Sequence, residues 1–238
     1  MLEAMGWALL GASSLLIGAL IAFAVRIGDR LLGFILAFGA GVLISAVAYE
    51  LVEEALTVGA AAGAVGAGFA LGALVFFLGD VAIDRRLKGP SARAGGLGIV
   101  LGAVLDGIPE SVVIGASLLA GESASVAVIV AVFLSNIPES ISASSDLIHD
   151  GWSRSRVLLL WIIVVVASTL AAGLGYVALE GAAGSWVAAI QAFAAGAILT
   201  MLADEMIPEA FENTEHNKSV GLALALGFAL SAVLSFSS

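Results

Sequence analysis

Eight apolar segments limit the folds that are open to this chain. Each segment is near the length of about 20 residues that a helix needs to span a bilayer. Hydrophobic residues make up 61% of the chain and charged residues 12%, whereas soluble domains carry about 25% charged residues. The sequence therefore predicts an all-α integral membrane protein with a single transmembrane domain over residues 1–238. The expected helices cover residues 4–25, 32–56, 59–81, 97–119, 124–148, 158–179, 186–210 and 220–236, with a cytoplasmic loop at 82–96.

The basic residues predict the orientation of these helices. All nine Lys and Arg residues follow the first, third, fifth or seventh segment, and therefore lie on one side. Cytoplasmic connections are enriched in basic residues, so we expect both termini to be extracytoplasmic, in the cell (inner) membrane. The opposite side carries acidic residues alone, which is ordinary topology bias or also attracts cations. The net charge of -10 argues against a nucleic-acid partner.

A short sequence motif occurs twice at membrane depth, at Leu105–Ser111 and, 29 residues later, at Leu134–Ser140. Both copies contain Ile-Pro-Glu, which places Glu110 and Glu139 inside the membrane. A carboxylate at the bilayer centre costs about 2.5–3.5 kcal/mol on insertion scales, and usually faces a wet or protein-lined interior where it has a function. Each proline also frees the carbonyl four residues before it. Carboxylates beside free carbonyls predict a site for a hard cation.

Helical spacing adds polar side chains to this site. Residues three and four apart share a face of a helix, which groups acidic, hydroxyl and amide side chains on the two central segments. Two other interpretations stay open: the glutamates would form a neutral pair that only holds two helices together, or the small hydroxyl residues would only allow close packing. The expected site residues on these segments are Asp106, Glu110, Ser135, Asn136, Glu139 and Asp146.

A second internal match relates the two ends of the chain. Residues 37–55 align without gaps with residues 192–210, at an offset of 155, and eight positions are identical, among them Glu50 with Glu205. The predicted orientation makes these two helices run in opposite directions. The first three and last three segments would then be inverted repeats around the central pair, in a 3+2+3 bundle. Such repeats are typical of alternating-access transporters, although an alanine- and glycine-rich composition produces part of the match by itself.

These residues resemble the ZIP (Zrt-, Irt-like protein) family of divalent-metal transporters, in its bacterial or archaeal form. The most specific stretches are Glu110–Ser117, which is similar to the family's Ser-Val-Val-Ile-Gly signature, and Asn136–Glu139. The resemblance implies eight helices and a binuclear metal site between the segments 97–119 and 124–148. It implies that Glu110 and Glu139 bridge the metals. The other ligand positions of the family fall on Asp106, Ser135, Asn136, Asp204 and Glu205.

The chain departs from the family at several ligand positions. Asp106, Ser135 and Asp204 stand where many members have histidine, and Gly107 stands where another ligand is expected, so one of the two metals would be weakly bound or missing. Carboxylate and amide oxygens suit Mn²⁺, Mg²⁺ and Ca²⁺, whereas imidazole favours zinc. The family implies zinc as the substrate, with iron, manganese or cadmium as further candidates.

We therefore expect a transporter that moves a divalent cation toward the cytoplasm by alternating access, with no catalytic cofactor and no enzyme activity. Glu50 would lie on the entry path, and Asp146, Asp204 and Glu205 on the release path. Two other classes stay open: a cation-coupled carrier of a small organic solute, although the chain offers no basic side chain at membrane depth to hold one, and a scaffold that does not transport. Glycine and alanine faces would allow a homodimer or packing within the chain equally well.

Overall fold

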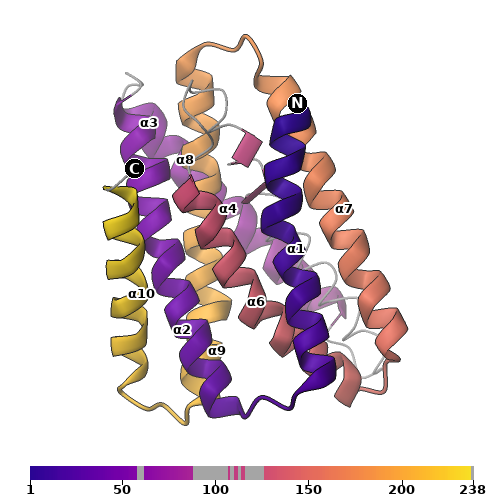
Figure 1. Ribbon diagram of the computed structural model, residues 1–238. Helices are drawn as coiled ribbons and strands as arrows, with labels where there is room; N and C mark the ends of the chain where they lie inside the picture. The colour runs from indigo at the N-terminus through magenta and orange to yellow at the C-terminus, as the bar shows by residue number, and fades with distance from the viewer. Residues whose placement is uncertain (58–61, 88–106, 108–109, 112–113, 116–125, 237–238) are drawn as a thin grey trace.

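The computed structural model describes residues 1–57, 62–87, 107, 110–111, 114–115 and 126–236, and all the secondary structure in these ranges is helical (Figure 1). Two short π-helical segments, η1 and η2, continue α2 and α8. The helices are α1 (Leu2–Ala24), α2 (Asp29–Ala46), η1 (Val47–Val52), α3 (Glu53–Thr57), α4 (Ala62–Leu87), α6 (Val126–His149), α7 (Arg154–Leu179), α8 (Gly184–Met201), η2 (Leu202–Met206), α9 (Ile207–Asn213) and α10 (Val220–Ser235).

Six of the helices in the described ranges are long and apolar enough to cross a membrane. This confirms the prediction of an all-helical membrane protein. The helix α10 is apolar but shorter, and the expected helix 97–119 lies outside the described residues except for a few helical positions. The helix α4 continues to Leu87, beyond the expected end at 81, because charged residues at a helix end can reach the membrane surface while the backbone stays helical.

Local sequence explains where several helices begin and turn. The helix α7 begins after Ser153, whose side chain accepts a hydrogen bond from the Arg156 N–H at 3.4 Å and so satisfies a free donor of the first turn. Gly151 precedes it with a φ of 87°, and Gly181 follows α7 with a φ of 78°. These left-handed conformations cost glycine little, which allows both turns to reverse the chain.

The helices pack most closely in two pairs, α2 with α10 and α4 with α8. Glycine permits backbone contact in both pairs. A Cβ at Gly41 of α2 would overlap the carbonyl oxygen of Leu224, and a Cβ at Gly196 of α8 would overlap the carbonyl oxygen of Phe69. Gly196 and Leu224 lie 155 residues after Gly41 and Phe69. The two contacts are therefore equivalent under the offset that aligns the two ends of the chain.

Further features follow the same offset. The π-helical segment η1 begins at Val47 and η2 begins at Leu202, again 155 residues apart. The reverse contacts of the two helix pairs also correspond, since Gly72 meets the Phe193 carbonyl and Gly227 meets the Phe38 carbonyl. Figure 1 shows α2 and α8 running in opposite directions. The two ends of the chain thus share sequence, helix irregularity and packing contacts.

The helix α1 packs along α6 and α7 beside these pairs. A core of apolar side chains around Trp161 joins α1, α6 and α7, and the indole Nε1 of Trp161 donates a hydrogen bond to Ser144 Oγ at 2.8 Å. Figure 1 shows the start of α1 and the end of α10 at one end of the bundle. The connections from α1 to α2, from α6 to α7 and from α9 to α10 lie at the other end, and each one contains a Lys or Arg or is followed directly by one.

Several glycines that the sequence offered for a homodimer pack within the chain. A Cβ at Gly18 of α1 would overlap Ser140 of α6, and one at Gly173 of α7 would lie 2.8 Å from Met5 Cγ. Such close approaches are the use that membrane helices make of small residues. A homodimer stays a prediction.

Candidate metal-transport site

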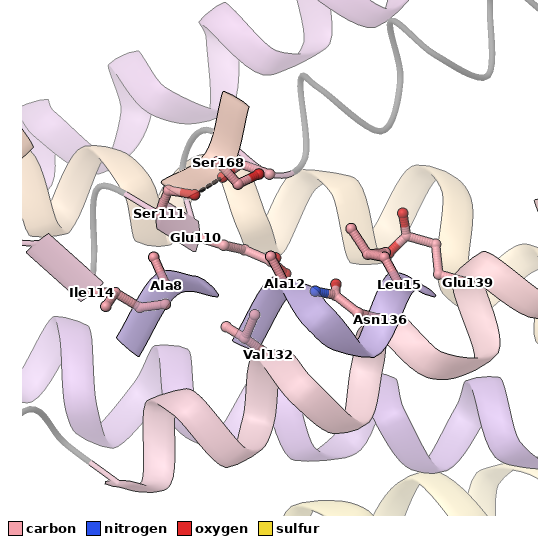
Figure 2. A pocket seen from close by; sticks show the side chains of 11 residues that line it. Ala8, Ala12, Leu15, Glu110, Ser111, Ile114, Val132, Asn136, Glu139 and Ser168 are labelled. Atoms are coloured by element: carbon pink, nitrogen blue, oxygen red, sulfur yellow. Dashed lines mark hydrogen bonds between the residues drawn. The ribbon is translucent and has the colours of Figure 1, made fainter. Parts of the chain in front are cut away.

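A small cavity lies where α1, α6 and α7 meet the described part of residues 107–115 (Figure 2). None of the described residues that line it is basic, and three of them, one before α6 and two on α6, were expected from the sequence to bind a cation. The polar lining residues are Glu110, Ser111, Asn136, Glu139 and Ser168, and the others are Ala8, Ala12, Leu15, Gly107, Ile114 and Val132.

Glu110 is the most deeply buried carboxylate of this cavity, with 4% of its surface exposed. Its Oε1 has no hydrogen-bond partner in the part of the chain that the structure describes. Figure 2 shows its side chain extending toward Asn136, which is equally buried. A buried polar atom without a partner costs about 1–3 kcal/mol. A cation between these side chains would supply a partner that the described residues do not.

The helix α6 carries Asn136 and Glu139 on neighbouring turns of one face and runs unbroken through Pro138. Pro138 has no N–H, so it leaves the carbonyl of Leu134 without its helical donor. That carbonyl was expected to face the cation, but it lies on the side of α6 against α2, where a Cβ at Gly39 would be 3.6 Å from it. The site is therefore built from side chains rather than from this carbonyl.

Ser135 also turns away from the cavity. Its hydroxyl is buried and donates to the carbonyl of Val132 at 3.0 Å, and its Cα lies against Gly39 of α2. Small hydroxyl residues in membrane helices often satisfy themselves in this way and allow close packing. Asp106, which was expected beside Glu110, lies outside the described residues.

The acidic residues expected along the path do not line the cavity. Glu50 is partly buried in η1. In η2, Asp204 is exposed and Glu205 is partly buried, and near the end of α6 Asp146 is exposed. Within the described ranges, no three Asp, Glu or His side chains lie close enough together to hold one metal ion.

Glu139 connects the cavity with acidic residues of η2 and α9. The negative charges of Glu205 and Glu209 act on its carboxylate from η2 and α9, and the charge of Glu139 acts on Glu110 from the other side. Like charges repel, so this row of carboxylates is attractive to a cation along its whole length. Asp146 at the end of α6 acts on Glu209 and also interacts with His149, Asp150 and Asp29.

Sequence analysis did not single out Gln191. It is the chain's only glutamine and is completely buried on α8, where its Nε2 donates to Glu54 Oε2 at 3.0 Å. The signal that could have found it is an isolated amide inside the apolar segment 186–210, because a buried amide in a membrane needs a partner. A second polar contact between distant segments joins Ser142 Oγ of α6 to Glu209 Oε1 of α9.

The family model of the ZIP Zinc transporter matches residues 86–235, which is more than half of the chain. None of the curated proteins matches the chain. The matched region contains the described cavity residues of α6 and α7 as well as Glu110. Together with the long apolar helices, this match confirms a multi-pass membrane protein whose substrate is a divalent metal. The chain belongs to the ZIP zinc transporter family.

Proposed function

We propose that the chain moves zinc, or the related cations of iron, manganese or cadmium, toward the cytoplasm through a carboxylate site between α6 and residues 107–115. The observation that carries this proposal is Glu110 Oε1, which is buried without a partner among the described residues. It shares its cavity with Asn136 and Glu139, and no basic side chain is among the lining residues that the structure describes. Two carboxylates balance the charge of a divalent cation, which makes the loaded site less costly to bury than the empty one.

The donors available at this site decide the expected metals. Glu110, Asn136 and Glu139 offer carboxylate and amide oxygens, and the lining residues in the described ranges include no histidine or methionine. Asp106 is a further ligand in the proposal, and Ser135 would join it only after its hydroxyl has turned away from the Val132 carbonyl. Oxygen donors bind Mn²⁺ well, whereas zinc and cadmium also accept carboxylates but favour softer ligands. The chain would therefore accept hard cations more readily than family members whose ligands include histidine.

Alternating access would come from an eight-helix 3+2+3 bundle of inverted repeats. Three observations support the repeat: the aligned sequences of residues 37–55 and 192–210, the corresponding start of η1 and η2, and the equivalent glycine contacts between helix pairs. A site near the midplane between such repeats can open to either side when one part rocks against the other.

The direction and path follow from the same arrangement. The basic connections at one end of the bundle support a cytoplasmic side there, with both termini extracytoplasmic in the cell (inner) membrane. A cation would enter past Glu50 and leave past Glu205 and Asp204. Asp146 would lie where this path reaches the cytoplasm. Protonation of carboxylates would help the metal to leave, because ligands must be deprotonated to bind it.

Uptake by the reconstituted protein tests this proposal. Zinc, cadmium, manganese, ferrous iron and magnesium would each be offered to proteoliposomes and to protein-free liposomes of the same lipid. We expect zinc and cadmium to accumulate above the protein-free level, and manganese as well, because the donors are oxygens. Accumulation of none of the five metals would contradict the proposal.

A further inference from the structure

Two glutamates occupy equivalent positions at opposite ends of the molecule. Glu54 of α3 and Glu209 of α9 are identical residues of the aligned stretches, 155 residues apart. The structure gives them different partners. Glu54 accepts a hydrogen bond from Gln191 of α8, and the residue equivalent to Gln191 under the offset is Leu36. The amide beside Glu209 is instead Asn213 of its own helix, so among the described residues an amide from another helix binds the glutamate at one end only.

At the other end the partner comes from the central helix. Ser142 of α6 has 8% of its surface exposed, and its hydroxyl donates to Oε1 of Glu209 on α9. Ser142 follows Glu139 by one helical turn, so this bond attaches the segment that carries the cavity residues to the second half of the chain. The contact joins elements that are far apart in the sequence and belong to different packing groups of the bundle.

The charges around this contact oppose it. Asp146 of α6 acts on Glu209 of α9 with like charge, and Glu209 acts in the same way on Glu139 of α6. Repulsion among these carboxylates would push α9 away from α6. The hydrogen bond from Ser142 is a charge-assisted one, stronger than a bond between neutral groups, and holds the two helices together against that repulsion.

We propose that the Ser142–Glu209 hydrogen bond is a latch that keeps α6 against α9 at the end of the bundle where the basic residues lie. Ser142 is then a positioning residue for the opening of that end. This inference rests on the proposed function, in which α6 must separate from α9 for a cation to leave Glu139. The equivalent carboxylate at the opposite end, Glu54, is bound by Gln191 instead. Among the described residues, the contact of Glu209 with a serine of α6 therefore differs in chemistry from the contact of Glu54 with an amide of α8.

The chain has no cysteine, so two introduced thiols can be labelled without background. The substitutions Ser145→Cys on α6 and Glu212→Cys on α9 place spin labels at exposed positions of both helices. The distance between the labels is measured by pulsed electron paramagnetic resonance, on protein in nanodiscs without added metal. A hydrogen bond to a charged group contributes about tenfold or more to an equilibrium. Separation of α6 from α9 lengthens the distance between the two labels. We therefore expect Ser142→Ala to raise the fraction of molecules with separated helices about tenfold.

Matched variants separate the latch from a general packing defect. Ser140→Ala removes a hydroxyl that bonds only to carbonyls of its own helix, so the distances should not change. Ser142→Thr keeps the hydroxyl and should show the native distance distribution. Glu209→Gln keeps an acceptor and should also show the native distribution. Glu209→Leu removes the acceptor and should resemble Ser142→Ala.

Equal distance distributions in native protein and Ser142→Ala would overturn the latch. The distances are measured without transport, so this result would leave the proposed function untouched. Absence of metal uptake by the native chain would instead contradict the proposed function, whatever the labels report.

Discussion

Replacement of Glu139 by glutamine is expected to reduce metal uptake by about a hundredfold or more. A divalent cation between Glu110 and Glu139 is neutralised by two carboxylates, and Glu139→Gln leaves Glu110 as the only acid among the described lining residues of the cavity. Breaking a buried charge pair by removing one partner costs about 3–5 kcal/mol, which corresponds to about a hundredfold to several thousandfold in binding. Initial rates of zinc and manganese uptake into proteoliposomes measure this effect.

The matched control is Glu215→Gln. Glu215 is exposed beyond the end of α9, so the same loss of charge should leave the uptake rate within about a factor of two. Both variants should insert and melt like the native protein, because glutamine has nearly the same shape as glutamate. Uptake by Glu139→Gln at the native rate would show that the cation does not pass this carboxylate.

The second large effect is a rise in stability with a loss of transport. Glu110→Met replaces a buried carboxylate, whose Oε1 lacks a partner among the described residues, by an apolar side chain of similar length. Removing the buried, unpaired group should stabilise the fold by about 1–3 kcal/mol, and active sites commonly sacrifice stability in this way. At about 2–4 °C for each kcal/mol, the melting temperature in detergent should rise by several degrees.

Uptake by the same variant decides why the carboxylate is there. A higher melting temperature with no uptake is the result for a functional carboxylate in a transport site. A higher melting temperature with unchanged uptake would match the scaffold interpretation, in which Glu110 has no function. A lower melting temperature would mean that Glu110 holds helices together, as in the neutral-pair interpretation.

The helical membrane fold could be predicted from sequence because it depends on local composition, and the family could be predicted because Glu110–Ser117 and Asn136–Glu139 resemble its motifs. Apolar segments of membrane length have few alternatives to a helix, since each backbone polar group must be satisfied inside the bilayer. Glu110 and Glu139 could be singled out for a related reason. A carboxylate in such a segment is costly wherever it faces, so its position within an apolar run indicates a function by itself.

Features that depend on contact between distant segments could not be predicted. Helical spacing places Ser135 on the stripe of Glu139, but the approach of Gly39 on α2 turns that side of α6 into a packing surface. The partner of Gln191 is on another helix, more than a hundred residues away in sequence. The π-helical segments η1 and η2 also gave no signal in the hydrophobic pattern, because one extra residue in a turn barely alters the periodicity.

The central claim is that Glu110 and Glu139 hold the transported metal together, and equilibrium dialysis of purified protein against zinc and manganese tests it directly. The native chain is expected to bind metal, whereas the double variant Glu110→Gln/Glu139→Gln should bind at least about a hundredfold more weakly. Glu215→Gln should bind like the native chain. Native affinity in the double variant would place the metal elsewhere and contradict the account.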